Sequence, residues 1–162
     1  MTNDDEAMAR ALELFREAYD KQMSGSLDEA EDLYRASIET FPTAEAHTFL
    51  GWTYSFQGRM EDAIEECKRA IQVDPDFGNP YNDIGAYLIE LNRLDEAMQW
   101  LRKALEAKRY DAYHFPYCNL GRIYLAKEMY TRARESFEKA LQITPDYEPA
   151  RRALEKVKRL IN

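Results

Sequence analysis

The chain has 162 residues, a net charge of −8 and a hydrophobic content of 45%. A disordered chain would be poorer in apolar residues, and a nucleic-acid-binding domain usually carries a basic face, so this composition argues against both classes. Glycine and proline number only six each, fewer than a sandwich or barrel with many tight turns would need, which favours helices.

The cysteines and the N-terminal sequence bear on the cellular compartment. Cys67 and Cys118 form neither a CxxC pair nor a ligand cluster, which is typical of reduced thiols. The first residues lack the basic start and apolar run of a secretory signal, and no stretch approaches the roughly 20 apolar residues of a membrane helix. We therefore expect a cytoplasmic protein without a membrane or nucleic-acid partner.

Hydrophobic periodicity and helix stop signals predict four helix pairs and one further helix. The first helices of the pairs are expected at about 5–24, 43–57, 78–91 and 113–127. The second helices are expected at about 27–40, 60–73, 94–108 and 130–143. Pro42, Pro75 and Pro145 follow second helices and end them, because proline lacks a backbone donor. The ninth helix is expected at about 147–161, with Pro149 in its first turn, where proline is tolerated.

The predicted pairs repeat one sequence pattern. Gly51, Gly85 and Gly121 each follow a Leu or Ile and are spaced by 34 and 36 residues. The best-preserved copy carries Leu50, Gly51, Tyr54, Gly58, Ala63, Ala70 and Pro75. A weaker copy lies upstream, with Glu17 and Ala18 in place of the Leu-Gly pair. This pattern resembles the tetratricopeptide repeat (TPR), a helix pair of 34 residues.

The resemblance implies an all-α fold, a right-handed superhelical solenoid of helix hairpins. It predicts a single domain over residues 1–162. The repeats are expected at approximately 11–43, 44–77, 78–113 and 114–147, and a capping helix at approximately 147–161. Arg109 stands where the third copy lacks its closing proline. A polar outer face on the last helix is expected because solenoids need polar caps for solubility.

Small residues should lie where the two helices of each repeat cross. A glycine inside a helix costs about 1 kcal/mol relative to alanine, so Gly51, Gly85 and Gly121 must permit contacts that return at least this much. Cys67 occupies a position where the repeat usually has a bulky residue, and we expect it to be a buried core thiol.

The chain offers little for catalysis or metal binding. Nucleophilic catalysis requires a Ser or Cys beside a His, but His47 and His114 fall two repeats apart. His114 and Cys118 share a helix face, yet two ligands are too few for a metal site. Glu65 and Glu66 are interpreted as solvated surface of a second helix. We therefore expect no enzyme activity, no metal and no cofactor.

The resemblance places the ligand in a concave groove lined by the first helices. Counting at helical spacing from each Leu-Gly position gives a stripe whose front half is aromatic and whose back half is polar. The stripe also includes Thr48, Asn79 and Phe115, with Asp83 beside it. The expected partner-binding residues are Phe15, Tyr19, Phe49, Trp52, Phe56, Asn82, Asn119 and Arg122. A large apolar patch favours a binding surface; alternatively, these rings pack between helices, or the first helix lies across the groove.

TPR domains that bind chaperones hold a partner's terminal carboxylates with Lys, Asn and Arg. The matching positions here carry Phe15, Tyr19, Phe49, Asn79 and Asp83. That clamp is absent and Asp83 would repel a carboxylate, so no recognition of an acidic chaperone tail is expected.

These observations favour a protein-interaction adaptor or scaffold that binds a peptide or helix of a partner in the groove. One alternative is a self-assembling scaffold, in which the groove takes a neighbour's terminal helix. The two ends could also associate head to tail, because the first twenty residues carry six acidic and two basic side chains while the segment from Asp146 onward carries three acidic and five basic ones. A secretion-type chaperone of similar build is another.

Overall fold

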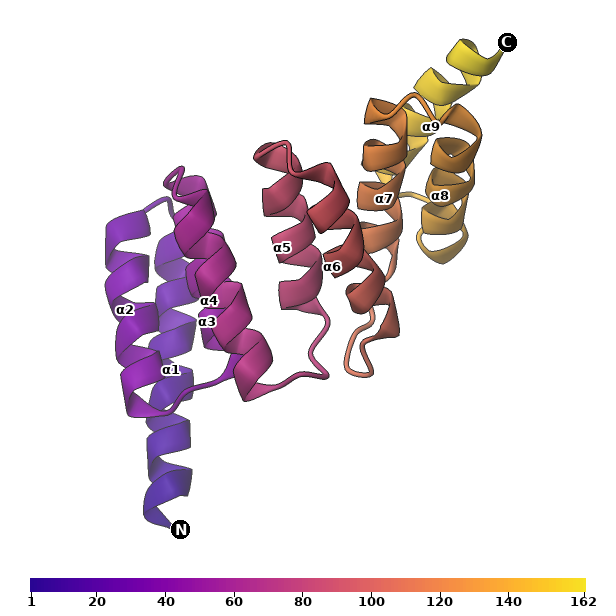
Figure 1. The fold of residues 1–162 in the computed structure, drawn as a ribbon. Coiled ribbons are helices and arrows are strands. Elements are labelled where there is room, and N and C mark those ends of the chain that lie inside the picture. The colour runs from indigo at the N-terminus through magenta and orange to yellow at the C-terminus, as the bar shows by residue number, and fades with distance from the viewer.

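The computed structural model describes all residues from 1 to 162 and consists of α-helices without a β-strand. The helices are α1 (Asn3–Met23), α2 (Leu27–Thr40), α3 (Ala44–Phe56), α4 (Met60–Val73), α5 (Asn79–Glu90), α6 (Leu94–Glu106), α7 (His114–Ala126), α8 (Tyr130–Ile143) and α9 (Glu148–Ile161). Successive helices pair as four hairpins, and α9 packs on α8. Figure 1 shows the hairpins stacked in a row, with the chain termini at opposite ends. The expected all-α solenoid is confirmed.

Every helix expected from the sequence is present, and no boundary differs by more than two residues. The largest differences have local causes. Helix α1 begins at Asn3 because Thr2 and Asp5 form a capping box, in which the Thr2 hydroxyl accepts from the Asp5 N–H at 3.2 Å and the Asp5 carboxylate accepts from the Thr2 N–H at 2.9 Å. Helix α6 ends at Glu106 because Ala107 turns into extended backbone.

The glycines of the first helices lie at the helix crossings, as expected. A Cβ atom on Gly51 would stand 2.9 Å from the carbonyl oxygen of Ala63, and one on Gly121 would stand 2.5 Å from a ring carbon of Phe137. Gly85 is similarly close to the side chain of Leu101. A side chain at any of these positions would therefore force the two helices of the hairpin apart or displace a core residue.

The residues that face these glycines form the core of each hairpin. Cys67, Leu101 and Phe137 occupy equivalent positions, 34 and 36 residues apart, and all three are fully buried. In the first repeat Tyr34 takes this position, opposite Ala18, and its hydroxyl donates to the Gln22 amide oxygen at 2.7 Å. The expected burial of the Cys67 thiol is confirmed, and burial raises the pKa of this thiol well above its usual range.

The turn inside each hairpin passes through one residue with left-handed backbone. These residues are Gly25, Gly58, Asn92 and Glu128, with φ angles of 85°, 77°, 57° and 60°. Glycine adopts this conformation freely and asparagine tolerates it, whereas other residues pay roughly 1–2 kcal/mol. The last of the four turns is therefore the strained one.

Replacing Glu128 by glycine is expected to raise the free energy of unfolding by about 0.5–1 kcal/mol, because relief of the left-handed strain exceeds the extra backbone entropy of glycine in the unfolded chain. Urea denaturation measures the change. The matched variant Asn92→Gly should gain less, since asparagine is already tolerated there. An Asn92→Gly gain equal to or larger than that of Glu128→Gly would contradict this account.

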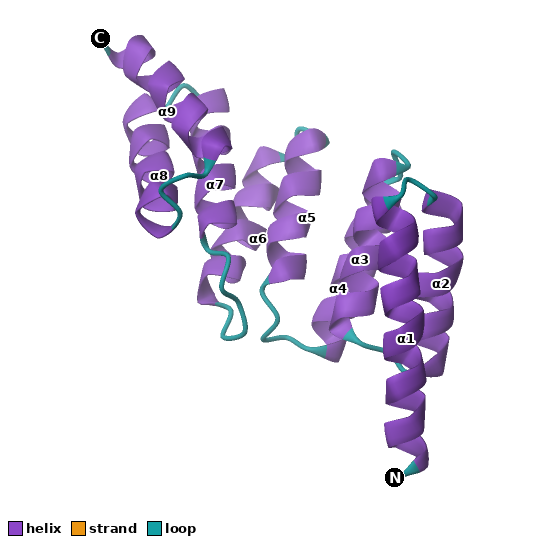
Figure 2. Cartoon of the chain, turned by 180° about the vertical axis from the view of Figure 1, so that it is seen from behind, coloured by secondary structure: helices purple, strands orange, loops and turns teal.

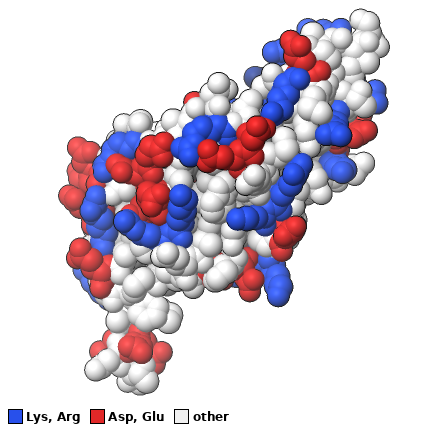
Figure 3. Space-filling view, viewed as in Figure 1, with Lys and Arg blue, Asp and Glu red and all other residues white.

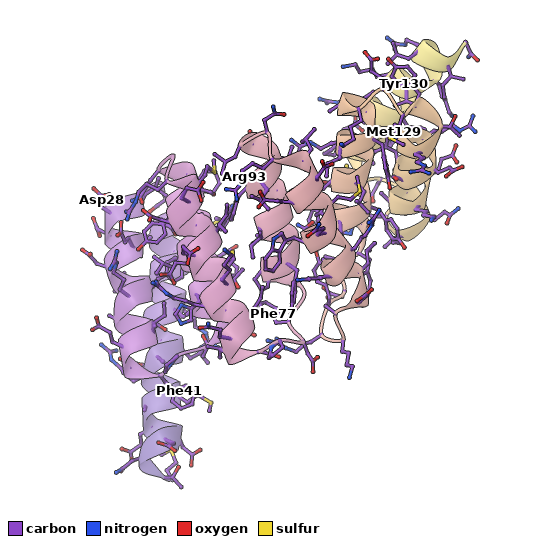
Figure 4. All side chains as sticks on the ribbon, in the orientation of Figure 1. Asp28, Phe41, Phe77, Arg93, Met129 and Tyr130 are labelled. Atoms are coloured by element: carbon purple, nitrogen blue, oxygen red, sulfur yellow. The ribbon has the colours of Figure 1, made fainter.

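The hairpin turns lie on one rim of the stack and the links between hairpins on the other. Figure 4 shows Asp28, Arg93 and Met129 on the turn rim and Phe41 and Phe77 on the opposite one. Along the turn rim, ion pairs join successive repeats. The pairs are Arg59–Glu31 at 3.3 Å, Arg93–Glu61 at 3.1 Å and Lys127–Asp95 at 2.7 Å. Exposed pairs of this kind contribute at most about 1 kcal/mol each.

Arg109 organises the opposite rim. Its guanidinium lies 4.1 Å from the centre of the Phe77 ring, 2.8 Å from the Asp74 carboxylate and 2.7 Å from that of Glu45. Its backbone N–H donates to the Asp76 carbonyl at 2.8 Å, and its carbonyl accepts from the Gly78 N–H at 3.1 Å. A proline could not make the first of these backbone bonds. Arg109, which stands where the repeat pattern has its closing proline, thus joins the link between α4 and α5 to the link between α6 and α7.

Candidate functional site: an aromatic pocket on the first helices

A pocket of about 320 Å³ opens on the side of the first helices. Its walls come from α1, α3, α5 and α7, one helix from each hairpin. The lining residues are Tyr19, Thr48, Phe49, Trp52, Asn79, Asp83 and Phe115. In Figure 2 the molecule is seen from behind, and α1, α5 and α7 follow one another from right to left. We call this cavity the aromatic pocket.

Phe49 holds the aromatic side chains together. Its ring centroid lies 5.2 Å from that of Phe15, 5.9 Å from that of Tyr19 and 5.7 Å from that of Trp52, in edge-to-face geometry. Trp52 in turn contacts Phe56 at 5.1 Å. Pairs in this geometry stabilise by about 0.5–1.5 kcal/mol beyond the area that they bury. The rings therefore fix one another and present a firm apolar surface.

The five aromatic residues expected in the groove take different places. Tyr19, Phe49 and Trp52 line the aromatic pocket. Phe15 packs beneath them against the core, 5.6 Å from the Tyr34 ring. Phe56 is 58% exposed and stacks on Trp52 outside the pocket. The structure thus places three rings in the pocket, one partly buried against the core and one at the surface.

The three polar residues expected at the back of the groove form a separate cluster. The Asn119 amide donates to the side-chain oxygen of Asn82 at 3.0 Å, and Arg122 donates to the Asn119 oxygen at 3.0 Å. Arg122 also reaches Glu90 of α5 at 3.1 Å. Asn82 is buried, so its polar atoms serve the contact between α5 and α7. None of the three lines the aromatic pocket.

Four residues outside the expected set complete the pocket, namely Thr48, Asn79, Asp83 and Phe115. All four belong to the stripe counted from the repeat pattern or adjoin it. The pocket uses Tyr19 and Trp52, each two residues after the Leu position of its repeat, but Asn79 and Phe115, each five residues before it. The pocket therefore crosses the stripe diagonally, a path that spacing along one helix does not reveal.

Asp83 is the charged residue of the pocket. Its carboxylate is half-buried, and burial raises its pKa to about 7, while the neighbouring Asn82 amide acts in the opposite direction. No Lys or Arg side chain lines the pocket with it. Burying a carboxylate without a cationic partner is unfavourable. The pocket thus combines apolar walls with one uncompensated acid.

The surface position expected for Glu66 is wrong. Glu66 is only 5% exposed and accepts from His47 Nδ1 at 2.8 Å and from Arg69 on its own helix. The helical period turns Glu66 toward α3, whereas the adjacent Glu65 stays exposed and pairs with Lys68 at 3.3 Å. The His47–Glu66 pair links α3 to α4 and does not line the aromatic pocket.

His114 has an aromatic environment. Its ring lies 4.1 Å from that of Phe115 and 4.9 Å from that of Tyr147, and burial lowers its pKa. No group of three or more His, Cys, Asp or Glu side chains is arranged to hold a metal ion. None of the helices combines the length and the apolar character needed to cross a membrane.

Comparison with known proteins identifies the family. Residues 44–77, 81–109 and 114–147 each match a model of the tetratricopeptide repeat. Together with the stacked hairpins, these matches show that the chain belongs to the tetratricopeptide-repeat family. Its relatives imply a scaffold for protein–protein interaction as the general function of such a chain.

The chain is similar to the type IV pilus assembly protein PilF of Pseudomonas aeruginosa, with 29% identity over 120 residues, 74% of this chain and 48% of that protein. The small glutamine-rich tetratricopeptide repeat-containing protein 2 of Mycosarcoma maydis is 28% identical over 63% of this chain and 29% of its own length. The chain thus spans about half or less of these two relatives.

Solved structures show the same fold. A structure of Pseudomonas aeruginosa PilF superposes with a TM-score of 0.85 at 24% identity and covers 96% of this chain and 69% of that one. A structure of YrrB, described as a TPR protein with an unusual peptide-binding site, has a TM-score of 0.71 at 20% identity and covers 90% of this chain and 74% of that one.

Proposed function

We propose that this protein is a non-catalytic adaptor whose aromatic pocket binds a segment of a partner protein. The observation that carries the proposal is the convergence of Tyr19, Phe49, Trp52 and Phe115 from three helices on one open cavity. Aromatic side chains in a concave, partly desolvated site are the usual anchors of peptide and helix recognition. Affinity should be modest, on the order of micromolar, which corresponds to about −8 kcal/mol.

Peptides that end in acidic residues are expected not to bind the aromatic pocket. No Lys or Arg lines it, and the Asp83 carboxylate would repel a terminal carboxylate. Isothermal titration calorimetry with a chaperone-type acidic tail measures this directly. Micromolar binding of that peptide, lost in Trp52→Ala, would contradict the expectation.

The proposed function is tested by affinity capture with wild type and a Trp52→Ala/Phe56→Ala variant, read by mass spectrometry. Partners retained by the wild type and lost by the variant are expected, because Trp52 lines the pocket and Phe56 supports it. The matched control is Trp100→Ala on α6, whose side chain lies outside the aromatic pocket. Circular dichroism verifies that all three proteins are folded. If the double variant keeps every partner, the aromatic pocket is not the binding site.

A second candidate function is self-assembly through the end of the stack. Met129, Leu160 and Ile161 are exposed apolar side chains that line one cavity at the C-terminal end. An uncovered face of this kind is suited to stacking on another copy. Light scattering across a concentration series distinguishes the two functions, because an adaptor of this size stays monomeric and a self-assembling scaffold gains mass with concentration.

The proposed compartment is the cytoplasm. Cys67 and Cys118 are free and buried, and unpaired thiols persist in a reducing environment. Fractionation of source cells with an antibody against the protein tests this proposal, and recovery outside the cytoplasm would overturn it.

A further inference from the structure

One feature of the aromatic pocket is not explained by apolar recognition alone. Asp83 lines this pocket together with Trp52 and Phe115, although a carboxylate there weakens the binding of a purely apolar ligand. Several Arg and Lys side chains elsewhere in the molecule form ion pairs with acidic neighbours, as Arg122 does with Glu90 and Arg109 with Glu45. The Asp83 carboxylate has no such partner.

We propose that the aromatic pocket receives a basic side chain of the partner protein, arginine ahead of lysine, with Asp83 as its counter-ion. The inference rests on the proposed function and names the partner residue that the pocket selects.

The chemistry of the pocket matches a guanidinium group. Tyr19, Phe49, Trp52 and Phe115 border the cavity, and a cation over the face of an aromatic ring is attracted by the electrons of that face. Guanidinium is planar, more weakly hydrated than ammonium, and suited to a carboxylate through two parallel hydrogen bonds. Arginine therefore loses less hydration free energy than lysine on entering a half-buried site. It also gains both the attraction of the aromatic rings and the paired hydrogen bonds to the carboxylate.

The residues that line the pocket with Asp83 include no cation that could pair with it. Burial raises the pKa of Cys67 on α4, of Tyr87 on α5 and of Tyr110 in the link before α7, and the charge of Asp83 adds to each shift. These groups are neutral near pH 7, so they neither neutralise Asp83 nor compete with a ligand. The other pocket residues carry no charge. The net charge of −8 adds a long-range attraction for a basic partner.

The face opposite the pocket carries charges of both signs. Figure 3 shows acidic and basic side chains interspersed over the face seen in Figure 1, without an extended patch of one sign. On the turn rim, Arg59 and Arg93 likewise pair with acidic residues of the preceding repeat. An unpaired, half-buried charge thus marks the aromatic pocket, and it is negative.

The test uses the chain of residues 1–162 carrying Trp100→Phe, so that Trp52 is its remaining tryptophan and reports on the pocket by fluorescence. The probes are libraries of short blocked peptides that share one fixed central residue, which is arginine, lysine, citrulline, leucine or glutamate. Citrulline has the shape of arginine without its charge. The protein variants are Asp83→Asn and, as a matched control, Asp32→Asn, which removes the same charge from an exposed site on α2.

In the wild type, we expect the arginine library to bind about tenfold more tightly than the citrulline library, with lysine between them and glutamate weakest. In Asp83→Asn the arginine and citrulline libraries should bind alike, whereas Asp32→Asn should keep the wild-type preference. Below pH 7 the preference for arginine should shrink as Asp83 becomes protonated.

Three outcomes would overturn the inference. If apolar libraries bind in a Trp52-dependent manner without a preference for arginine, the adaptor function stands and the basic anchor is wrong. If the preference for arginine survives Asp83→Asn, another group recognises the cation. If no library changes Trp52 fluorescence and light scattering shows a dimer that Asp83→Asn dissociates, the occupant is a second copy, and the adaptor function fails together with the inference.

Discussion

Replacing Phe137 by alanine is expected to lower the free energy of unfolding by about 3–5 kcal/mol, because the change leaves a cavity in a fully packed core. Phe137 is completely buried between α7 and α8, and it forms one core cluster with Ala133, Ala140 and Val157. Its ring fills the space that Gly121 leaves open at the crossing. The loss would leave the last hairpin and α9 marginally stable.

A mutant cycle with Gly121 shows whether the loss comes from this contact. Gly121→Ala alone should destabilise by about 1–3 kcal/mol, because the new methyl group would press against the Phe137 ring. Phe137→Ala removes the ring and so makes room for that methyl group. Urea denaturation should then show that Gly121→Ala costs less in the Phe137→Ala background. Strict additivity would contradict the packing described for this crossing.

Replacing Asp83 by asparagine is expected to stabilise the protein by about 2 kcal/mol at pH 8, because it removes a half-buried charge that has no partner. The pKa of Asp83 is raised from 3.8 to about 7 in the folded state. Between these values the folded protein binds one more proton than the unfolded chain, so this group lowers stability as the pH rises. The gain should therefore be full above pH 7 and vanish as the pH falls toward 4.

Denaturation of wild type and Asp83→Asn at several pH values measures the effect, because the other carboxylates titrate alike in both proteins and cancel. Asp32→Asn is the control and should show no dependence of this kind. A variant less stable than wild type at pH 8 would show that Asp83 makes a favourable contact in the fold. A more stable variant that loses its preference for arginine would show that stability is given up at this position for binding.

The fold could be predicted because the pattern that specifies it recurs. A small residue opposite a core side chain appears as Gly51 with Cys67, Gly85 with Leu101 and Gly121 with Phe137, so each copy supports the others. Helix ends were also readable, since proline and the hairpin turns bound the helices. The cap at Thr2 lay outside the repeat pattern, and the expected start of the first helix was therefore two residues late.

The site was less predictable, because it depends on how the hairpins are placed relative to one another. Spacing along one helix put Tyr19, Phe49 and Trp52 in one stripe, and all three line the aromatic pocket. It could not show that Phe115 and Asp83 reach the same cavity, since the twist of the stack brings the start of the later helices to the end of the earlier ones. Nor could it show that Asn82 and Asn119 bond to each other across two helices.

Glu66 shows the same limit inside one hairpin. A carboxylate with charged neighbours in the sequence is typical of an exposed position, and Glu65, which precedes Glu66, is indeed exposed. The burial of Glu66 depends on His47, which lies 19 residues earlier in the chain and reaches it only after the hairpin has formed. Partnerships of this kind follow from tertiary packing and not from local sequence.

The composition of the aromatic pocket from four hairpins has a consequence for the motions of the molecule. Each helix of the stack contacts only its near neighbours along the chain, so the terminal hairpins can open without unfolding the middle ones. Tyr19 belongs to the first hairpin and Phe115 to the last. Every opening of either end therefore dismantles the pocket. A bound segment would hold the two ends closed at once, and amide hydrogen exchange would slow in both terminal hairpins together.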